Sequence, residues 1–247
     1  MSQRPEDSGR ADPARRAELA ARLRRVQARI GAACAAAGRE AAGITLVAIT
    51  KTRPASDVRL LYEFGQRDFG ENRDQEAAPK AAQCAGLPIT WHFVGRLQTN
   101  KAASVARYAD VIHSVDRLRL VRALGNAACR QDRVLTCLIQ VDLGNREAGV
   151  SARGGAPRDQ VPALARAVAA EEGLVLGGIM AVAPLGVPAA AAFAGLAPAA
   201  AAVRAGRPGA AIVSAGMTGD LEEAVAAGAT HLRIGTALLG DRRPPVM

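Results

Sequence analysis

The chain has 247 residues, of which 49% are apolar and 3% aromatic, and it carries a formal net charge of +9. This length suits one large α/β domain or two small ones, with a core of aliphatic residues and alanine. The positive charge could attract a polyanion, but the few aromatic side chains disfavour a nucleic-acid partner bound by base stacking. The four cysteines show neither CxxC nor metal-ligand spacing, so we expect no metal site.

The first 13 residues are polar, and we expect them to be disordered, with residues 14–247 forming a single domain. They lack the apolar segment of a secretory signal, and no run of 18 apolar residues without helix breakers follows. Together with the unpaired cysteines, this predicts a cytoplasmic protein without a membrane span.

A long helix is expected to begin at Asp12-Pro13, because proline is favoured at the first position of a helix. Apolar side chains then recur at steps of three and four residues and form one stripe: Leu19, Leu23, Val26, Ile30 and Cys34. The same segment holds a cluster of arginines: Arg15, Arg16, Arg22, Arg24, Arg25 and Arg29. We interpret this cluster as the solvated face of the helix, with a nucleic-acid site as the alternative.

Beyond Gly43, short apolar runs alternate with helical stretches. The predicted strands are 44–50, 67–70, 90–95, 111–115, 134–142, 177–182, 211–214 and 231–235. The predicted helices are 56–64, 73–84, 97–107, 116–130, 158–172, 188–205 and 219–228, and Pro79 is expected to break or kink the second of them. This alternation predicts an α/β fold, a single (β/α)8 TIM-type barrel with an additional N-terminal helix. A doubly wound sheet is the main alternative, but no glycine-rich turn follows the first strand.

Lys51 follows the first predicted strand and opens the turn Thr52-Arg53-Pro54. It is one of only three lysines among 32 basic residues. Arginine keeps its proton and cannot act as an amine nucleophile, whereas a partly desolvated lysine can form a Schiff base. A chemical role for Lys51 and a chance surface lysine are both open at this point.

Two turns rich in glycine and hydroxyl side chains follow the last two predicted strands. They are Ser214-Ala215-Gly216-Met217-Thr218-Gly219-Asp220 and Arg233-Ile234-Gly235-Thr236. In such barrels the loops after strands seven and eight commonly bind phosphate, because small residues let the backbone approach an anion. With Lys51 opposite, they predict a Schiff-base site for a phosphorylated aldehyde, either pyridoxal phosphate or the phosphorylated sugar of an aldolase.

Four segments resemble those of the pyridoxal phosphate homeostasis protein family, small fold type III barrels related to the N-terminal domain of alanine racemase. The segments are VAITKTRP (47–54), FGENRDQE (69–76), WHFVGRLQTNK (91–101) and SAGMTGDLEEAVAAGATHLRIGTALLG (214–240). With the strands between them, the resemblance covers about residues 15–240.

The resemblance implies a cofactor, pyridoxal 5′-phosphate, held as a Schiff base on Lys51 with Asn72 near its ring. Arg233 would face the pyridine nitrogen and leave it unprotonated, because arginine keeps its proton, so the ring would be a weak electron sink. The phosphate group would be held by residues of the last two turns: Ser214, Gly235 and Thr236, with Gly216, Met217 and Thr218 completing the cup.

The chain departs from the family pattern at Arg96, where proline is usual, and at Ala215, where methionine is common. The segment 145–149 is a variant of a loop that usually includes serine, lysine and glycine. The resemblance gives Lys101 a secondary, reversible cofactor contact, with an exposed helical lysine as the alternative.

The resemblance further implies a monomeric or weakly associating protein that takes part in intracellular pyridoxal phosphate homeostasis with little or no catalytic turnover. Enzymes that lack their pyridoxal phosphate could receive the cofactor, and no nucleic-acid or membrane partner is expected.

A racemase needs a second acid/base group, which alanine racemase takes from a second domain of its partner subunit, and this chain ends soon after the eighth strand. Tyr62 and Tyr108 are predicted to lie in helices with structural roles. A pyridoxal-phosphate racemase or decarboxylase, a cofactor-free aldolase and a polyanion-binding protein are the alternatives.

Overall fold

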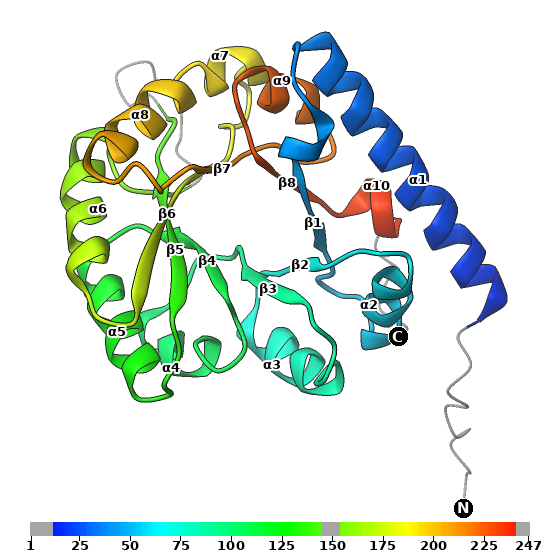
Figure 1. Ribbon diagram of the computed structural model, residues 1–247, viewed down its shortest axis with the longest axis horizontal. Coiled ribbons are helices and arrows are strands. Elements are labelled where there is room, and N and C mark those ends of the chain that lie inside the picture. The colour runs from blue at the N-terminus through cyan, green and yellow to red at the C-terminus, as the bar shows by residue number, and fades with distance from the viewer. Residues whose placement is uncertain (1–11, 145–153, 241–247) are drawn as a thin grey trace, which may run out of the picture.

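The computed structural model describes residues 12–144 and 154–240. The variant loop 145–149 lies outside the described residues, and so do residues 1–11 of the N-terminus that is expected to be disordered. The last two residues of that N-terminus are described: Asp12 caps the first helix and Pro13 begins it. The described strands form a closed barrel in the order β1-β2-β3-β4-β5-β6-β7-β8, and helices surround it (Figure 1). All neighbouring strands pair in parallel, which confirms the predicted (β/α)8 barrel and excludes the open sheet.

The strands are β1 (Thr45–Ile49), β2 (Asp68–Glu71), β3 (Thr90–Phe93), β4 (Val111–Val115), β5 (Leu135–Val141), β6 (Leu174–Ala181), β7 (Ile212–Ser214) and β8 (His231–Ile234). All eight predicted strands are confirmed. The largest difference is that β6 begins at Leu174 rather than at residue 177. Leu174 and Leu176 are buried whereas Val175 between them is exposed, so this segment follows the alternation of a strand.

The helices are α1 (Pro13–Ala36), α2 (Ala55–Glu63), α3 (Asp74–Gln83), α4 (Ala102–Val105), α5 (Leu118–Cys129), α6 (Val161–Ala170), α7 (Ala189–Phe193), α8 (Leu196–Gly206), α9 (Leu221–Ala226) and α10 (Thr236–Leu239). Short 3-10 turns form η1 (Ala41–Gly43), η2 (Thr99–Lys101) and η3 (Arg158–Gln160). The predicted helix 97–107 is reduced to η2 and α4. Tyr108 lies in a turn and not in the helix expected for it. Its hydroxyl lies 3.5 Å from Asp74 Oδ1, which is a structural contact.

Pro79 lies inside α3, and the expected break of this helix does not occur. A proline removes its own backbone donor, yet the bonds on either side persist, from Ala77 N to Arg73 O and from Cys84 N to Lys80 O. The buried face of α3, which includes Ala77, Lys80 and Ala81, holds the helix against the barrel.

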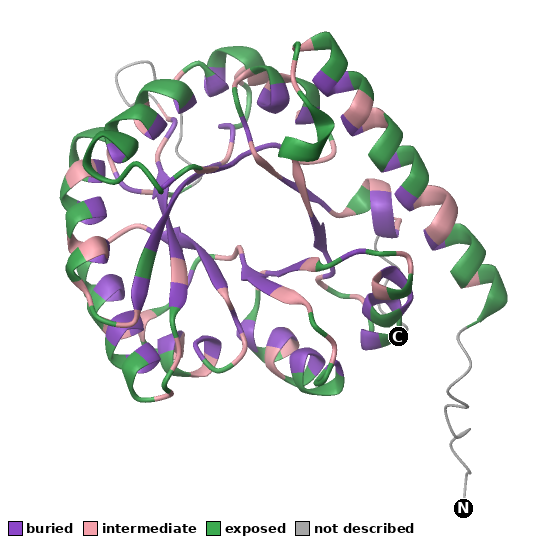
Figure 2. Cartoon of the chain, in the orientation of Figure 1, coloured by how far each residue is buried: buried purple, intermediate pink, exposed green. Residues whose placement is uncertain are grey.

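Helix α1 begins as predicted, with the Asp12 carboxylate accepting a hydrogen bond from Ala14 N at 3.0 Å. Its apolar stripe is buried where it packs on α9 and α10 (Figure 2). Arg15 pairs with Asp57 of α2 at 2.6 Å, and Arg29 pairs with Glu222 of α9 at 2.6 Å. These ion pairs tie α1 to its neighbours and support a solvated helix face over a nucleic-acid site.

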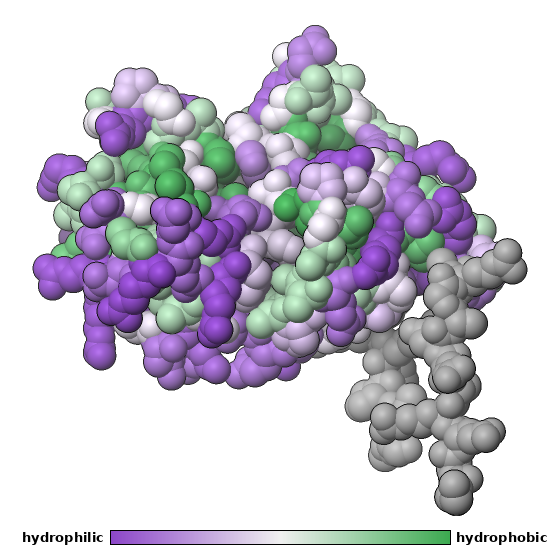
Figure 3. Space-filling model, turned by 60° about the horizontal axis from the view of Figure 1, so that its bottom comes forward, coloured by the Kyte–Doolittle hydropathy of each residue, from purple (hydrophilic) through white to green (hydrophobic). Residues whose placement is uncertain are grey.

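The stretch 189–206 is long and apolar enough to cross a membrane by length and composition, with a mean hydropathy of 1.3. The structure divides it at Gly195 into α7 and α8, and buries Phe193 and Leu196 completely or nearly so in the barrel core. The predicted single helix 188–205 is therefore two helices, whose large apolar side chains Phe193, Leu196 and Val203 are buried in the core. On the face shown in Figure 3, hydrophilic residues gather mainly at the lower left and along the edges, and hydrophobic residues are interspersed among them over the upper and central surface.

Candidate functional site

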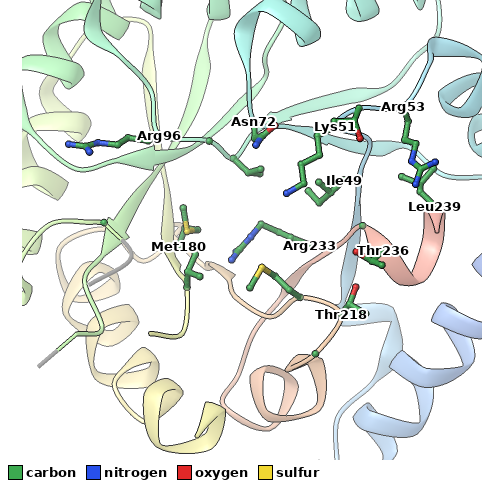
Figure 4. Close-up of a pocket in the computed structure, with 18 of the residues that line it drawn as sticks. Ile49, Lys51, Arg53, Asn72, Arg96, Met180, Thr218, Arg233, Thr236 and Leu239 are labelled. Carbon is green, nitrogen blue, oxygen red and sulfur yellow. The ribbon is translucent and has the colours of Figure 1, made fainter. Parts of the chain in front are cut away.

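A cavity of about 450 Å³ opens at the carboxyl ends of the barrel strands (Figure 4). Seven of the nine predicted site residues line it: Lys51, Asn72, Met217, Thr218, Arg233, Gly235 and Thr236. The other two, Ser214 and Gly216, are buried behind its wall. The fold therefore brings the end of β1 and the two turns after β7 and β8 to one hollow, as the sequence predicted.

The turn that carries Lys51 is fixed on both sides of this residue. Thr50 N donates to Gly70 O at 3.0 Å, and Thr52 N donates to Glu76 Oε2 at 2.9 Å. Thr52 has a φ of 63°, a left-handed conformation that strains a β-branched residue by about 1–3 kcal/mol and that the surroundings must hold in place. Lys51 itself is half-buried, and its amine extends into the cavity.

A buried ion pair supports this turn from below. Lys80 Nζ donates to Glu71 Oε1 at 2.5 Å and to Thr50 O at 2.7 Å, while Thr50 Oγ1 donates to the same carboxylate oxygen at 2.6 Å. Burial raises the pKa of Glu71, and the charge of Lys80 opposes that rise. Lys80 thus stabilises the fold, and of the three lysines it is Lys51 that lines the cavity.

Gly95 positions Asn72, a role that the sequence reasoning missed. A Cβ atom added at Gly95 would lie 2.1 Å from Asn72 O and 2.8 Å from Asn72 Cα, so no larger residue fits here without moving the Asn72 backbone. Both residues line the cavity. Gly95 stands within the WHFVG segment, but a glycine in a sequence does not show what its missing side chain makes room for.

The turns after β7 and β8 contact each other directly. Ala237 N donates to Thr218 Oγ1 at 3.4 Å, and Arg29 Nη1 of α1 donates to Thr218 O at 2.7 Å. Gly216 has a φ of 86°, and a Cβ atom there would lie 2.6 Å from Ala224 Cβ. Gly216 therefore shapes the first turn from behind, while Thr218 and Thr236 stand at the cavity wall (Figure 4).

Arg233 projects from β8 into the cavity although only 5% of the residue is exposed. Its guanidinium donates to Ser214 Oγ at 2.7 Å and to Ala181 O at 2.9 Å. Burial lowers the pKa of Arg233 to about 10, and the nearby Asp220 carboxylate opposes this shift, so the group stays charged at neutral pH. The buried Ser214 hydroxyl is engaged by Arg233 and by His113, and the phosphate contact expected for it does not fit this placement.

Two of the three histidines meet inside the barrel, which the sequence reasoning did not anticipate. His92 Nδ1 and His113 Nε2 lie 2.8 Å apart, although the two residues are far apart in the sequence. Within the described residues, no group of three or more His, Cys, Asp or Glu side chains could hold a metal ion.

Lys101 lies beside the cavity, in a second hollow that Asn72 and Arg96 also line. Its amine is 3.8 Å from Asp74 Oδ2, and 36% of its side chain is exposed. Arg96, one of the departures from the family pattern, extends away from Lys51 (Figure 4).

Comparison with known proteins agrees with this geometry. The family model for the alanine racemase N-terminal domain matches residues 16–243. The pyridoxal phosphate homeostasis protein of Pseudomonas aeruginosa is 39% identical over 224 residues, covering 91% of this chain and 96% of the relative. That of Mycobacterium tuberculosis is 42% identical over 250 residues, covering 94% of this chain and 95% of the relative.

One solved structure of a similar protein contains a bound ligand. PipY of Synechococcus elongatus, determined with pyridoxal phosphate bound, is 34% identical with a TM-score of 0.77, covering 90% of this chain and 100% of PipY. The chain therefore belongs to the pyridoxal phosphate homeostasis proteins, within the family of the alanine racemase N-terminal domain.

Proposed function

We propose that this protein binds pyridoxal 5′-phosphate as a Schiff base on Lys51 and takes part in intracellular pyridoxal phosphate homeostasis, with little or no turnover. One observation carries the proposal: the amine of Lys51 and the charged guanidinium of Arg233 extend into the same cavity, with Thr218 and Thr236 beside them (Figure 4). The bound ligand of PipY and the names of the bacterial relatives support it.

The cavity residues suit each part of this ligand. The Lys51 amine can condense with an aldehyde, so that a C=N bond forms and one water molecule leaves. Apolar side chains offer walls for a ring: Ile49, Val94, Met180 and Val182. The hydroxyls of Thr218 and Thr236 and the backbone at Gly219 and Gly235 suit a phosphate group.

The same residues favour holding the cofactor over using it. When bound, pyridoxal phosphate supplies a ring that can accept electrons from an attached substrate. Arg233 keeps its proton even with its lowered pKa, so it would donate to the pyridine nitrogen without protonating it, and the ring would be a weak electron sink. A racemase needs a second acid/base group, but no tyrosine or histidine is among the described residues that line the cavity, and the one carboxylate there, Asp116, is paired with Arg117.

We place this function in the cytoplasm, in a single-domain, monomeric or weakly associating protein that passes the cofactor to enzymes that lack it. All four cysteines are unpaired, which is the state that a reducing compartment favours.

Borohydride reduction after incubation with pyridoxal phosphate tests the proposal. The protein should turn yellow, and the reduced adduct should map to Lys51. Lys101→Ala is the matched control and should keep the colour, whereas Lys51→Ala should lose it. A colourless protein, or an adduct found on Lys101 alone, contradicts the binding proposal. Racemisation of an amino acid that Lys51→Ala abolishes would contradict the proposed lack of turnover.

A further inference from the structure

A line of hydrogen-bonded polar side chains crosses the barrel interior and ends at Arg233. Asp68 begins β2 at the amino end of the barrel, whereas Arg233 lines the cavity at the other end. The contacts are Asp68 Oδ1 to His92 Nε2 at 3.0 Å, His92 Nδ1 to His113 Nε2 at 2.8 Å, His113 Nδ1 to Ser214 Oγ at 3.0 Å, and Ser214 Oγ to Arg233 Nη1 at 2.7 Å. We call these five residues the interior chain.

The two ends of the interior chain allow only one direction for its hydrogen bonds when both histidines are neutral. The Asp68 carboxylate can only accept, so His92 carries its proton on Nε2 and leaves Nδ1 as an acceptor. His113 Nε2 must then donate to His92 Nδ1, and His113 Nδ1 becomes the acceptor for the Ser214 hydroxyl.

The opposite end demands the same direction. The Arg233 guanidinium can only donate, so Ser214 Oγ accepts from it and turns its own hydrogen toward His113. In the reverse arrangement the fully buried Ser214 hydroxyl would find no acceptor, and His92 Nε2 would present a lone pair to the Asp68 carboxylate. Each of these faults costs about as much as a buried unmade hydrogen bond, roughly 1–3 kcal/mol.

A neutral chain also fits the burial of its members. His113 is completely buried, and this burial together with His92, Arg233 and His231 holds its pKa well below the usual value. Of the five residues, Asp68 reaches the solvent most, with 27% of its side chain exposed.

The interior chain links the buried positive charge of Arg233 to a distant carboxylate. Within the described residues this buried cation forms no ion pair, and its acceptors are a hydroxyl and a backbone carbonyl. Buried charges are normally paired, because an isolated charge is poorly solvated in a protein interior. The aligned dipoles of Ser214, His113 and His92 connect Arg233 to the Asp68 carboxylate and point their negative ends toward the guanidinium.

We propose that Asp68, His92 and His113 are positioning residues for Arg233, which they hold through Ser214 as a one-directional chain of hydrogen bonds with both imidazoles protonated on Nε2 alone. The ligand that Arg233 meets rests on the function proposed above, but the direction of the chain does not. The consequence is that a carboxylate at the far end of the barrel sets the donor geometry at the cofactor site.

Nitrogen NMR of the ligand-free protein tests the direction of the chain. The sequence contains only three histidines, so ¹⁵N-histidine labelling yields three imidazole patterns, and His231→Gln identifies the one outside the chain. At pH 7 the rings of His92 and His113 should both be neutral with Nδ1 unprotonated. A proton on Nδ1 of either ring overturns the proposal, whether or not the protein binds pyridoxal phosphate.

A double-mutant cycle tests the link to Arg233 in the protein loaded with pyridoxal phosphate. Asp68→Asn keeps the shape of the side chain but removes its charge, and it should shift the visible absorption band and weaken binding by about two- to ten-fold, the effect of one weakened hydrogen bond. In a Ser214→Ala background, where the chain is cut, Asp68→Asn should have no further effect.

Asp110→Asn is the matched control, because Asp110 also lies at the amino end of the barrel, directly before β4, but accepts hydrogen bonds from Trp91 N and Arg133. It should leave the absorption band and the affinity unchanged. Equal effects of Asp68→Asn with and without Ser214, or no effect of Asp68→Asn in the wild type, overturn the positioning role. Failure of every variant and of the wild type to bind pyridoxal phosphate would instead contradict the proposed function, and the NMR result would still stand on its own.

Discussion

The two walls of the cavity manage buried charge in opposite ways. On the β1–β2 wall, Lys80 lies 2.5 Å from the Glu71 carboxylate, so the buried cation and its anion are in direct contact. On the β7–β8 wall, Arg233 is held by Ser214 and a backbone carbonyl, and the carboxylate of its interior chain lies at the other end of the barrel. The first arrangement neutralises its charge locally, whereas the second leaves a positive group available to a ligand.

Because of this difference, the β1–β2 wall contributes mainly to stability and the β7–β8 wall mainly to ligand binding. The Glu71–Lys80 pair holds the strained turn that presents Lys51, and it has no need of a ligand. Among the described residues Arg233 donates to Ser214 and to Ala181 O, so a ligand in the cavity can accept its remaining hydrogens. The comparison predicts that changes in the first wall act mainly on stability and changes in the second mainly on binding.

Breaking the ion pair of the first wall should have the largest effect. Lys80→Met leaves the Glu71 carboxylate buried without its counter-charge and should lower the free energy of unfolding by about 3–5 kcal/mol in urea denaturation. Arg16→Met is the control, because Arg16 and Glu63 form an exposed pair, and should cost less than about 1 kcal/mol. Similar losses for the two variants would show that the buried pair does not support the wall.

Acid should lower the free energy of unfolding, because protonation of two buried histidines, His113 and His231, favours the unfolded state. Burial lowers the pKa of His231 to about 4 and that of His113 well below 6.5. The unfolded chain takes up these protons below about pH 6.5, so their contribution to stability is complete above that pH and is lost as the pH falls toward 4. His231 should account for about 2 kcal/mol between pH 7 and pH 5, measured by urea denaturation, and His113 should act in the same direction.

His231→Gln isolates one of these contributions. Glu71 acts in the opposite sense, because a carboxyl with a raised pKa in the folded state contributes stability at low pH that is lost as the pH rises above 4.5. The contribution of Glu71 is the same in the variant and in the wild type, so it cancels when the two are compared. Between pH 7 and pH 5 the free energy of unfolding of the variant should fall by about 2 kcal/mol less than that of the wild type. An equal loss in both proteins would contradict the assignment.

Gly95→Ala should disturb the Asn72 backbone on the first wall. The added methyl group would lie 2.1 Å from Asn72 O, so the loop must move, at about 1–3 kcal/mol of stability and with weaker pyridoxal phosphate binding. Gly31→Ala in α1 meets no atom within 4 Å and should instead stabilise the protein by about 0.5–1 kcal/mol. Thermal denaturation and spectroscopic titration measure both effects, and a harmless Gly95→Ala would sink the packing argument.

The smallest effect is expected at the rim of the second wall. Thr236→Ala removes one hydroxyl from an exposed turn and should weaken pyridoxal phosphate retention by about two- to ten-fold without lowering the melting temperature. An unchanged dissociation constant would mean that the phosphate group is bound without this hydroxyl.

The sequence predicts the barrel well because its evidence is periodic and local. Runs such as 44–50 and 111–115 are too apolar for a surface, and a helical stretch follows each of them. Lys51 stands out because lysine is rare in this chain, and the turns after β7 and β8 stand out through their glycines and hydroxyls.

The missed features depend on contacts between distant segments. Ser214 closes β7, and only the rotation of that strand in the closed barrel turns its hydroxyl inward toward Arg233. His92 and His113 meet because β3 and β4 are neighbours with a particular register. Gly95 matters because Asn72 packs against it, and α3 keeps its helix through Pro79 because tertiary packing outweighs local preference.

The scarcity of lysine has a further consequence for the chemical selectivity of the surface. Aldehydes react with any accessible side-chain amine, so a protein that meets a reactive aldehyde cofactor is exposed to unspecific modification. Here arginine carries most of the positive charge, Lys80 is buried in an ion pair, and Lys101 lies near Asp74. Under the function proposed above, the surface would attract an anionic aldehyde and offer it few competing side-chain amines, which would direct the condensation to Lys51.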